Sequence, residues 1–173
     1  MEKELLIRYR SFLKDSIRKE IDFSKTDQHQ GVPPPPIEKP YPPDAEITEL
    51  PGVGSFQGQF GVDLQKAIRN RESRRSYRAE PITLKELSFL LWATQGVRRR
   101  LDAGHALRTV PSAGCRHALE TYLCILNIEG LSPGIYRYLP LEHRLLFEFT
   151  EENLRKRIVH SALGQPYPGE AAV

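Results

Sequence analysis

A proline-rich segment, residues 31–43, constrains what this chain can fold into more than any other feature. Its sequence, GVPPPPIEKPYPP, holds seven of the 14 prolines in the chain. Proline fixes φ and lacks a backbone N–H, so we expect extended polyproline II here and no helix. Two roles are open: a ligand for an SH3-type domain, or a stiff arm packed along the domain surface. We favour the arm, because prolines lose little entropy on ordering.

The proline-rich segment separates an N-terminal helix from the rest of the chain. Residues 4–20 place apolar side chains at helical spacing, which predicts a short amphipathic helix. These side chains are Leu5, Tyr9, Phe12, Leu13 and Ile17. We therefore predict an N-terminal helix and proline-rich arm over residues 1–58, followed by one domain over residues 59–173.

The predicted domain opens with two helices. Residues 62–70 form the first, with Leu64, Ala67 and Ile68 facing inward. The second begins at a capping box, in which Thr83 caps and Glu86 reaches back, and runs to Thr94 before Gln95-Gly96 ends it. Its large apolar residues imply deep burial. These are Leu84, Leu87, Leu90, Leu91 and Trp92.

Strands follow these helices. We expect a basic loop over residues 97–111, and then strands over 119–128, 134–139 and 144–149. Thr150 is expected to cap a last helix over 151–163, and the remaining residues read as a loop. Helices, then strands, then a helix predict an α+β fold.

Composition excludes several classes of protein. A net charge of +3 does not demand a nucleic-acid partner. Cys115 and Cys124 form no CxxC pair or Cys/His quartet, so we predict no metal site. The first residues lack the apolar run of a signal peptide, and no window approaches the roughly 20 apolar residues of a membrane span. We therefore expect a cytoplasmic protein with no membrane partner.

Five residues, Arg74-Arg75-Ser76-Tyr77-Arg78, form a compact cluster of hydrogen-bond donors. The guanidinium group is always charged and donates in a rigid fork, which suits a pair of phosphate oxygens. A solvated loop, a nucleic-acid patch and a phosphate clamp are the three interpretations. The patch is disfavoured because Tyr77 is the sole aromatic nearby and no binding motif follows. No P-loop or GxGxxG accompanies the cluster.

A second segment, Arg108-Thr-Val-Pro-Ser-Ala-Gly114, is small and turn-prone, so its backbone can approach a flat ligand closely. Together the two segments suggest a phosphorylated cofactor. Next to this segment, His117 faces a substrate or the cofactor in one interpretation and is held by packing in the other, which we favour. A redox role for Cys115 is disfavoured because no resolving partner is near. Glu120 is expected to form an ordinary ion pair with Arg116 or Arg108.

Four pieces of sequence in this order carry a family resemblance: RNRESRRSYR, LSFLLWATQG, RTVPSAGCRHALETYL and GIYRY. From about residue 60 onward, the chain resembles the nitroreductase superfamily, and in particular its SagB-type dehydrogenase branch. That branch includes thiazoline and oxazoline oxidases of peptide natural-product pathways. The proline-rich arm and the turn at Leu50-Pro51-Gly52 also resemble a lead-in found in some members.

The resemblance implies a nitroreductase-like α+β fold, with a central sheet rich in antiparallel pairs and flanked by helices. It also implies an FMN cofactor at the subunit interface of an intertwined homodimer. Arg74, Arg75, Ser76 and Arg78 would hold the FMN phosphate and ribityl chain. Pro111, Ser112, Ala113 and Gly114 would line the isoalloxazine, contributed by the partner subunit. No catalytic acid or base is assigned.

Members of this family usually continue for tens of residues beyond a segment like ALGQPYPGEAAV. The resemblance therefore implies that a C-terminal part of the fold is missing: a strand, a long dimer helix, flavin contacts and a lysine–tyrosine catalytic pair. A fragment, a remainder on another chain and a truncated paralogue are the three alternatives.

The implied function is FMN-dependent oxidoreduction, with hydride exchanged through flavin N5. The substrate would be a small or peptide-derived molecule, and NAD(P)H is a candidate electron donor. The alternative is a flavin-free, truncated family member that acts as a non-catalytic partner or scaffold subunit. A basic nucleic-acid-binding module is the third and least favoured hypothesis.

Overall fold

A computed structural model describes residues 2–56 and 61–173. The chain divides into two compact units, Met1–Pro35 and Pro36–Val173. The domain boundary expected between residues 58 and 59 lies outside the described residues. None of the helices in the described ranges is both long enough and apolar enough to cross a membrane.

The first unit consists of helix α1 (Glu2–Phe12) and two 3-10 turns, Asp15–Glu20 and Phe23–Lys25. The helix expected over residues 4–20 is therefore shorter than predicted. Its apolar side chains are exposed, since Phe12 and Leu13 keep 71% and 83% of their surface in solvent. The spacing of the apolar residues correctly predicted a helix, but no other described part of this unit packs against the apolar face of that helix.

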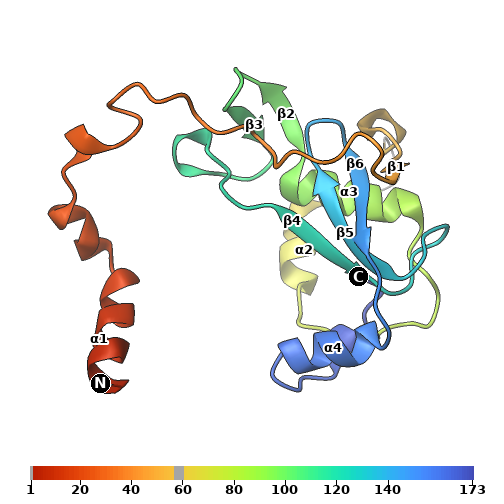
Figure 1. Cartoon of the computed structure of the whole chain (residues 1–173). Helices are drawn as coiled ribbons and strands as arrows, with labels where there is room; N and C mark the ends of the chain where they lie inside the picture. Colours follow the sequence, from red (N-terminus) through yellow and green to blue (C-terminus); the bar gives the residue numbers. More distant parts are fainter. Residues whose placement is uncertain (1, 57–60) are drawn as a thin grey trace. The chain divides into compact units, whose positions relative to one another are not determined.

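The second unit is built on a four-stranded antiparallel sheet in the order β1-β6-β5-β4 (Figure 1). The strands are β1 (Ile47–Glu49), β4 (Thr121–Ile125), β5 (Gly134–Leu139) and β6 (Arg144–Phe149). The predictions for β5 and β6 are confirmed to the residue, and β4 is shorter than expected. Strand β1 was not predicted, because three residues are too few to show an alternating pattern.

Helix α3 (Leu84–Gln95) packs on one face of this sheet and forms the core with it (Figure 1). The helix begins at the predicted capping box, in which the Thr83 hydroxyl accepts the Glu86 N–H and the Glu86 carboxylate accepts the Thr83 N–H. Leu87 and Leu91 are buried, whereas Leu90 is 46% exposed, so its predicted burial is wrong. From the sheet, the core includes Leu123, Ile125, Tyr136, Tyr138 and Leu145.

Helix α2 (Leu64–Asn70) forms where it was expected, but its apolar residues do not face inward. Leu64 is 73% exposed and Ile68 is 69% exposed. The helical period was correct, and the buried face was wrong because every residue described between 61 and 81 lies on the surface.

The basic stretch 97–111, expected as a loop, begins with a hairpin formed by β2 (Val97–Arg100) and β3 (Ala106–Arg108). In its turn, the Asp102 carboxylate accepts the Gly104 N–H and contacts the His105 ring at 2.8 Å. These contacts lower the pKa of Asp102, the Gly104 N–H most strongly.

The C-terminal part corrects two further expectations. Helix α4 (Leu154–Ser161) begins at Asn153, whose backbone is left-handed with φ of 61°. Thr150 does not cap it, since the Thr150 hydroxyl donates to the Pro133 carbonyl instead. A short helix α5 (Tyr167–Glu170) replaces the expected loop. The Ala172 carbonyl then accepts the N–H groups of Leu126 and Asn127.

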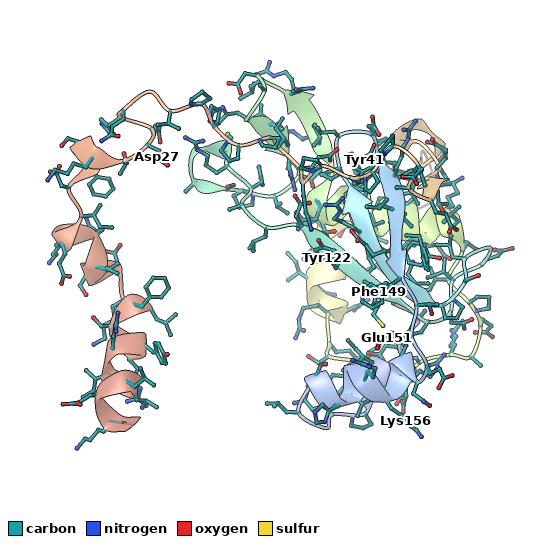
Figure 2. The ribbon with its side chains drawn as sticks, in the orientation of Figure 1. Asp27, Tyr41, Tyr122, Phe149, Glu151 and Lys156 are labelled. Atoms are coloured by element: carbon teal, nitrogen blue, oxygen red, sulfur yellow. The ribbon has the colours of Figure 1, made fainter. Side chains whose placement is uncertain are left out.

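The second half of the proline-rich segment, residues 36–43, is tied to the second unit, and we call it the strap. Ile37 is buried. The Tyr41 hydroxyl, labelled in Figure 2, donates to the Glu142 carboxylate. The buried Arg137 guanidinium donates to the Pro40 carbonyl at 3.4 Å and pairs with Glu148. These contacts favour a stiff arm over a free ligand for this half of the segment.

A chain of buried hydrogen bonds joins α3 to the turn between β5 and β6. The Ser88 hydroxyl donates its one proton to the Pro51 carbonyl and lies 2.7 Å from His143 Nε2. Nε2 must therefore carry the imidazole proton, which leaves Nδ1 to accept from the Tyr138 hydroxyl at 2.7 Å. Tyr138 thus packs in the core and also makes a polar contact that the sequence did not indicate.

This arrangement predicts a pH dependence of stability. Burial lowers the pKa of His143, so below about pH 6.5, where an unfolded histidine takes up a proton, the native state binds fewer protons than the unfolded state. We expect the free energy of unfolding to fall as the pH drops from 7 to 5. His143→Asn, which tolerates the φ of 56° at this position, should flatten that dependence in urea titrations. An unchanged slope in the variant would contradict this account.

Candidate functional site

The arginine-rich segment, residues 71–80, is an extended and exposed stretch between α2 and α3. Arg75 lies over the Tyr167 ring of α5, 5.5 Å from its centroid. Arg74 pairs with Glu72 at 2.9 Å, although both side chains are largely exposed. The segment is therefore fastened to the C-terminal helices at Arg75, and Arg74 is held by a pair that solvent weakens.

Arg78 lines a polar pocket of about 400 Å³. Asn127 and Arg155 line the same pocket, and Asn127 donates from its side-chain amide to the Ala79 carbonyl. The Arg155 guanidinium donates to the Gly169 carbonyl. Among the described residues Arg78 forms no ion pair, so its guanidinium is available to an anion. The remaining lining residues are Tyr77, Ala79, Glu170 and Ala172.

Arg155 is the residue that the sequence did not reveal. It lies far along the chain from the arginine-rich segment, in helix α4. None of the four sequence motifs that carry the family resemblance includes Arg155. Arg155 approaches Arg78 only because α4 and α5 fold back beside the arginine-rich segment. Two guanidiniums and a side-chain amide at one pocket suit a phosphate.

The second predicted group lies in the loop that follows β3, residues 109–119, which we call the PSAG loop. Pro111, Ala113 and Gly114 are exposed, and Ser112 is half-buried. The loop contains a 3-10 turn over Ala113–Cys115. Its exposed small side chains leave the backbone accessible to a flat ligand.

The PSAG loop carries backbone strain. Cys115 and His117 have φ of 56° and 45°, in the left-handed region that non-glycine residues avoid at about 1–2 kcal/mol each, and Gly114 has φ of 63°. Such conformations persist where surrounding contacts impose them. One contact is internal, since the Ser112 hydroxyl accepts the His117 N–H at 2.9 Å.

His117 is half-buried, and its ring interacts with the Ala106 carbonyl. Partial burial lowers the pKa of His117, and the nearby Arg108 charge lowers it further. These contacts belong to the packed interpretation of this histidine, the one that the sequence favoured.

The first stem of the loop is fastened to the end of α3. The Thr109 N–H donates to the Gly96 carbonyl, and its hydroxyl donates to the Trp92 carbonyl, both at 2.9 Å. A side chain at position 96 would meet the Trp92 ring at 2.4 Å, so the close approach requires glycine there. This gives a role to the Gln95-Gly96 helix end, for which the sequence offered none.

The two predicted groups lie at different places in the second unit. The arginine-rich segment runs beside α4 and α5, whereas the PSAG loop extends beyond β3 near the hairpin (Figure 1). Among the described residues, the polar and ring contacts of the arginine-rich segment with other parts of the chain are to α5 and to Asn127, and none is to the PSAG loop. One copy of the chain therefore presents a candidate anion site and a candidate flat-ligand site separately.

Apart from these two groups, the described residues contain free thiols but no metal-binding cluster. No cluster of three or more His, Cys, Asp or Glu side chains within them could hold a metal ion. Cys115 and Cys124 are free thiols, and burial raises the pKa of the Cys124 thiol.

The sequence model of the nitroreductase family matches residues 68–173, which span both predicted groups and the whole of α3 to α5. The chain belongs to the nitroreductase family. This confirms the predicted nitroreductase-like α+β fold. A predicted nitroreductase of Methanocaldococcus jannaschii is 32% identical to this nitroreductase-family chain over 106 residues, which are 61% of this chain and 51% of that protein.

A solved structure of a predicted nitroreductase from Anabaena variabilis is similar to this family member with a TM-score of 0.51 and 28% identity. The match covers 64% of this chain and 22% of that one. The chain thus spans about half the length of the M. jannaschii relative and a smaller share of the Anabaena protein.

Proposed function

We propose that this nitroreductase-family chain is an FMN-dependent oxidoreductase. The observation that carries the proposal is the polar pocket beside Arg78, which Arg155 and Asn127 also line, and in which the Arg78 guanidinium has no ion-pair partner in the described part of the chain. A dianionic phosphate needs several charge-assisted donors, and this set fits one. When bound, the flavin would supply hydride exchange at N5, and the chain's residues would bind and orient it.

The separation of the two groups supports a site shared between two copies. In this proposal Arg74, Arg75, Ser76 and Arg78 of one copy hold the phosphate and ribityl chain, and the PSAG loop of its partner covers the ring. The uncovered apolar residues of one copy are consistent with such a homodimer. They include Leu64, Ile68, Leu119 and Leu163, all at least 69% exposed.

The proposed branch is the SagB type, and the proposed substrate is a small or peptide-derived molecule, with NAD(P)H as candidate electron donor. The order of the four sequence pieces and the proline-rich lead-in support the branch. Among the described residues we assign no side-chain acid or base, so the chain's contribution is to position the flavin and shield it from water.

The test is whether the purified protein carries flavin. We expect a yellow sample whose flavin absorbance is released on denaturation and which takes up added FMN after stripping. A colourless protein that takes up no FMN would overturn the proposal and favour the non-catalytic scaffold. Binding of oligonucleotides that weakens steeply with salt would instead indicate a nucleic-acid-binding protein.

A further inference from the structure

Two strap residues contact the two ends of the PSAG loop, which we call its first and second stems. The two strap residues are only two positions apart in the sequence. Ile37 lies at one contact and Lys39 at the other. The strap precedes the loop by about 70 to 80 positions in the sequence, so this juxtaposition is a product of the fold.

The contact at the first stem is made by Arg108. Its guanidinium is 8% exposed and donates from Nη2 to the Ile37 carbonyl at 3.4 Å. Nε has no hydrogen-bond partner among the described residues. Burial lowers the pKa of this guanidinium, and the charges of Glu120 and Glu38 oppose that effect. The buried charge of Arg108, at the first stem, is therefore stabilised by one carboxylate of the strap, Glu38, and one at the second stem, Glu120.

The contact at the second stem is made by Glu120. Its carboxylate oxygen Oε1 accepts the Lys39 N–H at 2.6 Å, a short charge-assisted hydrogen bond. Glu120 directly precedes β4, where pairing with β5 begins at Thr121. The sequence predicted an ordinary ion pair for Glu120, and the structure gives its carboxylate a backbone donor from the strap in addition to the nearby Arg108 charge.

The loop between these stems needs such support. Two non-glycine residues in it, Cys115 and His117, hold left-handed backbone conformations. Conformations of this kind relax unless contacts on both sides determine them. Fixing the distance between the stems reduces the number of backbone conformations that the loop can adopt.

We propose that the strap is a positioning element for the PSAG loop, and that Glu120 and the Lys39 N–H form the bond through which it acts. The role of the strap in catalysis rests on the proposed function, because the strap would hold the loop in position to contact the flat ring of the flavin. Neither residue touches the proposed ligand, so both are positioning residues.

Position 39 offers a matched pair of variants. Lys39→Pro removes the backbone N–H that Glu120 accepts and adds one more proline to a segment already rich in them. Lys39→Ala removes the exposed side chain and keeps the N–H. Glu120→Ala deletes the acceptor and serves as the second probe if Lys39→Pro does not fold. Glu142→Gln is a further control, because Glu142 contacts the strap at Tyr41 and not at the loop stems.

The first readout is hydrogen exchange of the amides of residues 112–119, which needs no flavin. We expect Lys39→Pro and Glu120→Ala each to raise these rates about tenfold, with no further rise in the double variant, because both remove one bond. Lys39→Ala and Glu142→Gln should match the parent protein. Unchanged loop rates in both probes, or a rise spread equally over the sheet, would overturn the proposal.

The second readout is the dissociation constant for FMN, which we expect to rise several-fold in Lys39→Pro and Glu120→Ala only. If the parent protein binds no FMN, the proposed function fails, and the exchange rates still decide whether the strap positions the loop. If FMN binds and the loop loosens without any change in the dissociation constant, the positioning role toward the flavin is wrong.

Discussion

Replacing Arg78 with alanine is expected to raise the dissociation constant for FMN about 10- to 150-fold. This corresponds to the roughly 1.5–3 kcal/mol that a charge-assisted hydrogen bond to phosphate contributes. Arg78 lines the pocket shared with Arg155 and forms no ion pair among the described residues. The measurement is a fluorescence titration of stripped protein with FMN.

The matched control is Arg99→Ala. Arg99 is exposed on strand β2, so this change removes the same unit of charge away from the pocket. The Arg74→Ala variant should also weaken binding, but less, because Arg74 is already paired with Glu72. Equal affinities for the Arg78 variant, the Arg99 variant and the parent protein would remove the arginine-rich segment from the site.

The largest effect on stability is expected from Leu87→Ala. Leu87 is 1% exposed and belongs to the core between α3 and the sheet. Removing three buried carbon atoms there loses their transfer free energy and leaves a cavity, which together cost about 2–5 kcal/mol. The midpoint of urea unfolding should fall accordingly, with little change in the m-value.

Leu90→Ala is the control for that experiment, because it makes the same chemical change on the same helix. Leu90 is 46% exposed, so we expect it to cost no more than about 1 kcal/mol. A Leu87 variant as stable as the Leu90 variant would mean that α3 does not pack on the sheet as described.

Local sequence signals predicted the elements whose determinants are local. The capping box at Thr83 predicted the start of α3, and the two strand-like stretches on either side of residues 140–143 predicted β5 and β6. The same signals failed where a neighbour decides the outcome. Leu64 and Leu90 have the spacing of inward residues, yet no element of the second unit covers them fully.

The sequence indicated which residues could bind the ligand at the candidate site, but not which residues support them. Arginine clusters and segments of small, turn-forming residues can be recognised from the sequence alone, so Arg78 and the PSAG loop could be named as candidates in advance. Arg155 could not be named in advance, and neither could the contact of Glu120 with the strap, because both depend on segments that approach only in the folded chain. The hydrogen bonds from Ser88 through His143 to Tyr138 were hidden for the same reason.

The strap also has a consequence for how the chain reaches its folded state during synthesis. Lys39 and its acceptor are 81 positions apart, and Glu38 and the Leu141 N–H that it accepts are 103 positions apart. At ribosomal elongation rates of about 5–20 residues per second, the strap waits several seconds for the partners that hold it. Its prolines keep it extended through that interval, and contacts of such long range are expected to be among the last to form.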